Sequence, residues 1–137
     1  MWDDPDAPPV LVALPPVTVA GVAEVRRRVT EAGHEVGLSP ERAAAFTVAV
    51  NEIVINAVEH GGGTATVTLI LQARRLVVEV VDQGTAPWQF NVPAAAPPPD
   101  QLHGRGLWLA TKLSDELTVD ASGTDRLVRL TAHSHGR

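Results

Sequence analysis

The chain of 137 residues contains no cysteine, so disulfide bonds and metal sites built on thiolates are excluded. It also lacks any apolar run near the roughly 20 residues that a membrane-spanning helix needs. Its first residues, MWDDPDAPP, are acidic and rich in proline, which is the opposite of a signal peptide. We therefore expect a cytoplasmic protein that makes no contact with a membrane.

Positive charge is scarce as well. The formal net charge is −5, and no basic stretch is long enough to follow a nucleic-acid backbone. Because affinity for nucleic acids comes largely from neutralising phosphates, we expect no direct nucleic-acid partner. Hydrophobic residues, by contrast, make up 45% of the chain, which suffices for one core but not for two. Residues 1–9 read as a disordered lead-in and residues 10–137 as a single domain.

The spacing of apolar residues predicts an α+β fold. Ser39-Pro40-Glu41 is typical of a helix start, and Gly61-Gly62-Gly63 of a helix end. Pro15-Pro16 ends a short first strand, which suits the edge of a sheet. The expected strands span residues 10–14, 64–71, 76–82, 116–121 and 126–133, and the expected helices span residues 19–35, 40–60 and 106–113. This order predicts a two-layer α/β sandwich, in which helices cover one face of a mixed, mostly antiparallel sheet.

Residues 85–103 form a long connection that carries five prolines and several alanines but no periodic pattern. Connections of this length without their own secondary structure are usually functional lids or disordered inserts. We interpret this segment as a lid over a binding site.

Glu52 and Asn56 are four residues apart on the longest predicted helix, so their side chains share one face. Glu59 and His60 lie close to the same line, and taken alone the whole set is explained more simply as a solvated stripe. The functional alternative is an oxygen ligand for Mg²⁺ beside a general base. Mg²⁺ takes few protein ligands and completes its shell with phosphates and water, so one asparagine is enough.

Two glycine-containing blocks follow in the chain. Asp82 ends an apolar strand. In the functional interpretation, its carboxylate accepts a hydrogen bond from the exocyclic amine of a base, and Gly84, which has no side chain, lets the flat base approach the backbone. Gly104, Arg105 and Gly106 precede a helix, where free N–H groups and a guanidinium suit phosphate oxygens. Each block also has a simpler explanation, the first as a turn and the second as a hinge.

The ordered set E-x-x-x-N-A, D-x-G and G-x-G-L resembles the GHKL (Bergerat) ATP-binding fold of gyrase, Hsp90, histidine kinases and MutL. The run AVNEIVINAVEHGGG is similar to the small stand-alone branch of that fold, the anti-sigma-factor serine/threonine kinases. This resemblance covers roughly residues 10–132 and implies ATP and Mg²⁺ as cofactors.

The resemblance also implies a role for each matching residue. Glu52 would be the general base, and Asn56 would coordinate Mg²⁺. The nucleotide itself would be bound by Asp82 and Gly84 at adenine, and by Gly104, Arg105 and Gly106 at the phosphates.

One position departs from the family pattern G-T-x-V-x-L, whose threonine helps to frame adenine. If Val128-Arg129-Leu130 aligns with the end of that pattern, Thr124 is displaced and Arg126 takes its place. The departure predicts an altered adenine pocket.

The resemblance implies a kinase that phosphorylates an anti-anti-sigma partner of the STAS type and sequesters a sigma factor, with a homodimer as one option for its oligomeric state. The alternative is an interaction module that binds ATP or no nucleotide and transfers no phosphate. Glu52 favours the kinase, because binding alone needs no base, whereas the changed threonine position favours the module. An ATPase is a third, weaker alternative.

Overall fold

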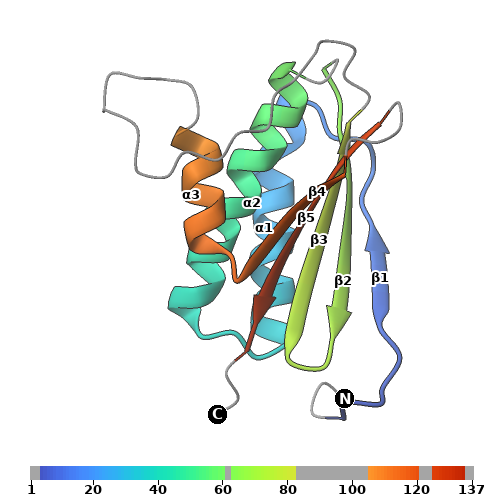
Figure 1. Ribbon diagram of the computed structural model, residues 1–137. Helices are drawn as coiled ribbons and strands as arrows, with labels where there is room; N and C mark the ends of the chain where they lie inside the picture. Colours follow the sequence, from blue (N-terminus) through green and yellow to red (C-terminus); the bar gives the residue numbers. More distant parts are fainter. Residues whose placement is uncertain (1–3, 61–62, 83–104, 121–124, 135–137) are drawn as a thin grey trace.

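The computed structural model describes residues 4–60, 63–82, 105–120 and 125–134. Within them, one sheet with the strand order β1-β2-β3-β5-β4 is covered on one face by helices (Figure 1). The elements are β1 (Val10–Ala13), the 3₁₀ helix η1 (Val19–Gly21), α1 (Val22–Glu35), α2 (Pro40–His60), β2 (Thr66–Gln72), β3 (Arg75–Asp82), α3 (Arg105–Leu113), β4 (Glu116–Asp120) and β5 (Arg126–His133). The predicted α+β two-layer sandwich is confirmed.

The sheet is more regular than expected, because every pairing between the described strands is antiparallel. The reason lies in the connection between the first two strands. Helices α1 and α2 run in opposite directions, so β2 starts at the end of the sheet where β1 stops (Figure 1). The parallel pair that a mixed sheet requires is therefore not formed among these strands, while β1 lies at the edge as predicted.

Helix α2 begins where the sequence predicts. The Ser39 hydroxyl accepts a hydrogen bond from the Arg42 backbone N–H at 3.2 Å, which caps the first turn. The Arg42 side chain then donates to the Asp115 carboxylate at 2.6 Å and to the His133 carbonyl at 2.8 Å. These contacts fix the start of α2 to the segment before β4 and to the end of β5.

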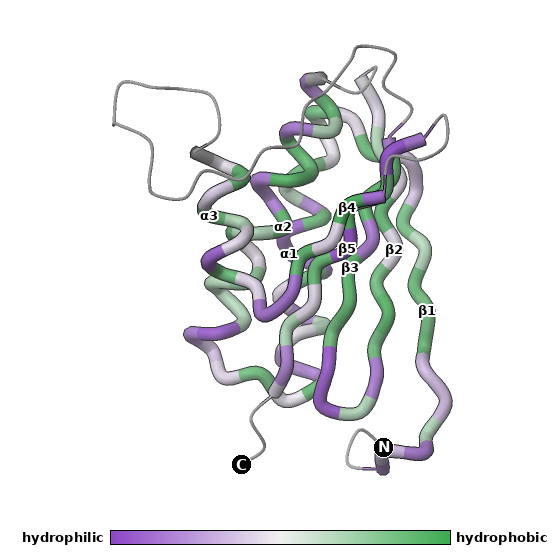
Figure 2. Tube along the Cα trace, in the orientation of Figure 1, coloured by the Kyte–Doolittle hydropathy of each residue, from purple (hydrophilic) through white to green (hydrophobic). Residues whose placement is uncertain are grey.

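The core lies between the helices and the sheet. Apolar residues fill the centres of β2 and β3, while hydrophilic residues mark the hairpin that joins them (Figure 2). The helix-facing residues alternate along the strands and are buried at Val67, Leu69, Leu71, Leu76, Val78, Val80, Val128, Leu130 and Ala132. Asp82 and Arg126 continue this alternation, so both side chains point toward the helical layer.

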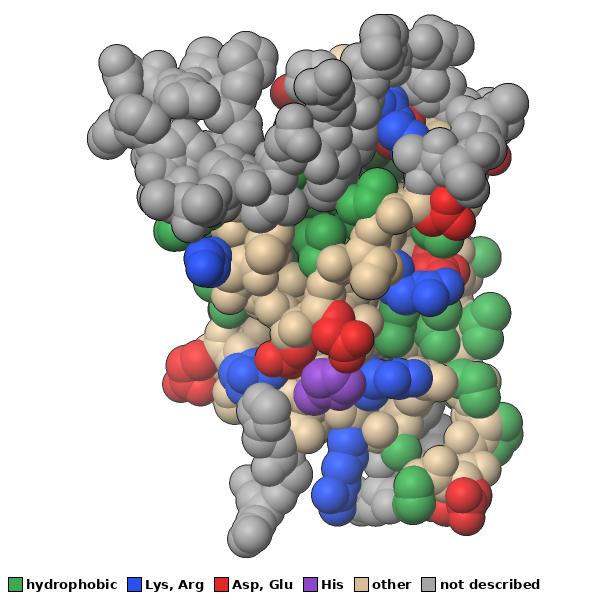
Figure 3. Space-filling view, viewed as in Figure 1, with side chains coloured by type: hydrophobic (Ala, Val, Ile, Leu, Met, Phe, Trp, Pro, Cys, Tyr) green, Lys and Arg blue, Asp and Glu red, His purple; other side chains and the backbone are tan. Residues whose placement is uncertain are grey.

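Charges of both signs are interspersed over the face shown in Figure 3. On the exposed side of α1, which Figure 3 does not label, Arg27 donates to Glu24 and to Glu31. The hydrogen bond from Arg27 lowers the pKa of the Glu24 carboxyl below its ordinary value. Across the described ranges, no helix is both long enough and apolar enough to cross a membrane.

Candidate functional site

Glu52 lies on the flank of α2 that packs against the first turn of α3. A Cβ atom added to Gly106 would lie 2.6 Å from the Glu52 Oε2 atom, which is closer than any real contact of this kind. Only glycine therefore fits at this position while the Glu52 carboxylate stays where it is. The structure brings together two residues that the sequence places in separate motifs.

The neighbouring positions of α2 face different partners. Asn51 accepts a hydrogen bond from Arg26 of α1 at 3.0 Å, whereas Glu52 faces α3. Asn56, one turn after Glu52, is half-buried like Glu52, while Glu59 is exposed. A fully solvated stripe therefore describes Glu59 but not Glu52 or Asn56.

Asp82 forms a buried ion pair with Arg126 across β3 and β5. The two residues are directly opposite in the strand register. Their side chains are 4% and 8% exposed, and the Arg126 Nε and Nη2 atoms lie 3.0 Å and 2.9 Å from the same oxygen, Asp82 Oδ1. Motif reasoning singled out Asp82 and noted Arg126 as a departure, but it did not predict this direct pair. The signal was available, since Asp82 ends one strand and Arg126 begins another.

The remaining residues singled out by the sequence lie outside the described part of the chain. They are Gly84, Gly104 and Thr124, together with the lid interpreted at residues 85–103. Helix α3 starts at Arg105, but the side chain of that residue is not among those described.

The two contacts lie toward the same end of the molecule, because α2 and β3 both run in that direction (Figure 1). Among the described residues, no group of three or more His, Cys, Asp or Glu side chains gathers in a way that holds a metal ion. A Mg²⁺ ion carried mostly by phosphates and water needs only one protein oxygen, which Asn56 is able to supply.

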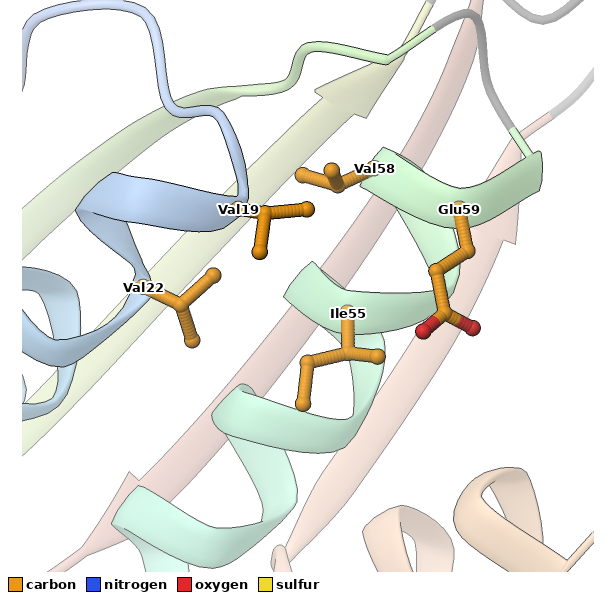
Figure 4. Close-up of a pocket in the computed structure, with 5 residues that line it drawn as sticks. All are labelled: Val19, Val22, Ile55, Val58 and Glu59. Atoms are coloured by element: carbon orange, nitrogen blue, oxygen red, sulfur yellow. The ribbon is translucent and has the colours of Figure 1, made fainter.

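A separate apolar hollow lies between η1, the start of α1 and the last turns of α2. It is lined by Val19, Val22, Ile55, Val58 and Glu59, and its volume is about 150 Å³ (Figure 4). Ligand pockets usually measure roughly 300–1,000 Å³, so this hollow is too small for a nucleotide. Its lining does not include Glu52, Asn56, Asp82 or Gly106.

Solved structures share this fold. The RsbU and RsbW domains of Rv1364c from Mycobacterium tuberculosis align with a TM-score of 0.64 and 23% identity, over 93% of this chain and 32% of that chain. The Acinetobacter baumannii histidine kinase AdeS aligns with a TM-score of 0.50 and 11% identity, over 93% of this chain and 70% of that chain. The chain thus spans about a third of the length of the first structure.

The comparison with curated proteins found no match. The comparison with family models found one, the Histidine kinase-like ATPase domain, over residues 16–132. A domain of this kind implies ATP binding, and the expected resemblance to the GHKL fold is confirmed by this match. On a match that covers most of its length, the chain belongs to the histidine kinase-like ATPase domain family.

Proposed function

We propose that the protein is an ATP- and Mg²⁺-dependent serine/threonine kinase that regulates a sigma factor by phosphorylating a partner protein. The observation that carries this proposal is the contact between Glu52 and the glycine at the start of α3. It joins a carboxylate to the helix start whose glycines and arginine suit phosphate oxygens. Phosphoryl transfer to a hydroxyl needs a general base next to the segment that binds the phosphates.

In this proposal Glu52 accepts the proton of a serine or threonine hydroxyl on the partner. Gly106 lets the backbone of α3 approach that carboxylate closely, because it has no Cβ atom. Gly104 and Arg105 complete the phosphate-binding segment. Asn56 supplies one oxygen ligand to Mg²⁺, which offsets phosphate charge when it is bound.

In this proposal the adenine ring of the nucleotide binds at the end of β3. Asp82 accepts from the exocyclic amine of adenine, Gly84 lies beneath the ring, and Thr124 belongs to the segment that frames it. The burial of Asp82 supports this assignment, because hydrogen bonds to a carboxylate are stronger away from water.

The partners belong to this proposal as well. The likeness to a structure that contains an RsbW domain supports a partner-switching role, in which a STAS-type anti-anti-sigma protein is the substrate and a sigma factor is the client. A homodimer and a cytoplasmic location complete the proposal.

Calorimetric titration with ATP, with and without Mg²⁺, tests the first half of this proposal. We expect Mg²⁺ to strengthen ATP binding. Incubation of the protein with Mg²⁺-ATP and purified STAS-domain proteins, followed by mass spectrometry, tests the second half. A phosphorylated serine or threonine on one of them is the expected result, and absence of nucleotide binding by the folded protein would contradict the proposal.

A second candidate is favoured by the Asp82–Arg126 ion pair. A protein whose base-recognition carboxylate is already paired is suited to bind nucleotide weakly or not at all, and so to bind regulators without transferring phosphate. ATP binding without labelling of any partner would support this interaction module over the kinase.

A further inference from the structure

The Asp82–Arg126 ion pair has features that set it apart from an ordinary cross-strand pair. Both of its side chains are almost fully buried and point toward the helical layer. Two nitrogen atoms of Arg126, Nε and Nη2, lie within hydrogen-bond distance of one oxygen, Asp82 Oδ1. Both nitrogen atoms therefore contact the same carboxylate oxygen.

The same two strands carry a second arginine–carboxylate pair with a different setting. Arg129 of β5 is directly opposite Glu79 of β3, and its Nε donates to Glu79 Oε2 at 2.9 Å. Arg129 is exposed, with 51% of its side chain accessible, and lies on the face away from the helices. This pair joins the strands without touching the helical layer. Its mutation therefore removes a cross-strand ion pair without changing the proposed nucleotide site.

A base that binds at Asp82 through an exocyclic amine needs an oxygen of the same carboxylate. Arg126 already holds Oδ1 with charge-assisted bonds in a place shielded from water. An amine that binds at Oδ1 must therefore share this acceptor with two guanidinium N–H groups, or replace them. The net binding free energy of the nucleotide is therefore what its own contacts contribute, less the cost of weakening the contacts between Arg126 and Asp82.

We propose that Arg126 is a specificity-determining residue of the nucleotide site, which competes with the adenine amine for the Asp82 carboxylate and thereby weakens ATP binding. This inference rests on the proposed function, because it takes Asp82 as the base-recognition residue. It predicts that nucleotide affinity is set by how readily Arg126 leaves Asp82.

The test compares Arg126→Thr with the wild type and with Arg129→Thr as the matched control. Calorimetry measures the affinity for ATP and for purine riboside triphosphate, which lacks the amine at C6. For Arg126→Thr we expect ATP to bind about tenfold more tightly, which corresponds to part of a charge-assisted bond. The analogue without the amine should gain much less, and Arg129→Thr should bind both nucleotides like the wild type.

Removal of Arg126 leaves a buried carboxylate, which can destabilise the fold. Arg126→Gln is therefore made as a second variant, since its amide still donates to Asp82 without a positive charge. Circular dichroism and melting curves confirm that each variant is folded. If Arg126→Thr does not fold, Arg126→Gln must bind ATP more tightly than the wild type, and an unchanged affinity overturns the proposal.

The outcomes separate this inference from the proposed function. If the wild type binds ATP and the folded Arg126 variants bind it equally or more weakly, the inference is wrong and the proposed function stands. An equal gain for ATP and for the analogue also overturns it, because the amine would then play no part. If no folded variant and no wild-type sample binds nucleotide, the proposed function fails and the inference fails with it.

Discussion

At the scale of single residues, the site depends on which flank of α2 a side chain occupies. Glu52 faces α3, and its neighbour Asn51 faces α1. Glu59 lies two turns after Glu52 on the same line of the helix and is exposed. Three polar residues of one helix therefore have three different surroundings, and each gives a distinct expectation for mutation.

Glu52→Gln should leave ATP binding near the wild-type value and slow phosphoryl transfer by about 10²–10⁴-fold, the usual effect of losing a general base. The amide keeps the size of the side chain but cannot accept the proton. Labelling of a STAS-domain substrate measures the rate, and Glu59→Gln on the same helix serves as the control. A wild-type rate for Glu52→Gln would remove Glu52 from the chemistry.

Asn56→Ala should weaken ATP binding in the presence of Mg²⁺ and change it little in the presence of EDTA. The reason is that the alanine removes the one protein oxygen assigned to the metal. Calorimetry under both conditions provides the measurement, and Asn51→Ala provides the control because Asn51 faces α1. Equal losses with and without Mg²⁺ would show that Asn56 acts on the nucleotide or on the fold instead.

At the scale of elements, α2 and α3 approach each other closely where Gly106 faces Glu52. Gly106→Ala places a methyl group where the Glu52 carboxylate now lies. Because the end of a glutamate side chain moves easily, we expect the melting temperature to stay close to that of the wild type. Displacement of a reacting group by about 1 Å can cost roughly 10²-fold in rate, so phosphoryl transfer should fall by about that factor.

Gly21→Ala is the matched control for this prediction. Gly21 is the N-cap of α1, and its added Cβ atom would meet only Val17 Cγ1 at 3.6 Å, an ordinary contact. Both variants should melt like the wild type, and only Gly106→Ala should lose transfer. A large loss of stability in Gly106→Ala would show instead that α3 cannot pack against α2 with any side chain there.

The elements were largely predictable from the sequence because their signals are local. Ser39 and Pro40 mark the start of α2, and alternating apolar residues mark β2 and β3. The contacts between elements were not predictable in the same way. The Gly106–Glu52 approach depends on how two helices pack, and the Asp82–Arg126 pair depends on the register of β3 and β5. Neither packing nor register is encoded in a short motif.

At the scale of the whole molecule, stability depends on the layer between helices and sheet. Phe46 of α2 is 1% exposed and belongs to that core, so Phe46→Ala should lower the free energy of unfolding by about 3–5 kcal/mol. Val48, two residues later, is 43% exposed, and Val48→Ala should change the free energy of unfolding by less than about 0.5 kcal/mol. Urea denaturation measures both, and similar losses for the two variants would contradict the assigned core.

The two proposed halves of the site belong to different layers. Glu52 and Asn56 are on a helix, while Asp82 and Arg126 are on the sheet. The end of α2 and the end of β3 lie together only because α1 and α2 return the chain before β2 begins (Figure 1). The antiparallel arrangement of the sheet is thus what places a helix motif and a strand motif at one end of the molecule.

Because glycine has no side chain, the Glu52 carboxylate lies directly against the backbone of α3 at Gly106 and is sensitive to the position of that helix. With no Cβ atom between them, a displacement of the first turn of α3 changes the surroundings of Glu52 directly. Glutamate labelled with ¹³C at its carboxyl carbon would register such a displacement as a change in chemical shift, without any attached probe. Glu59, exposed on the same helix, would supply the reference signal in the same spectrum.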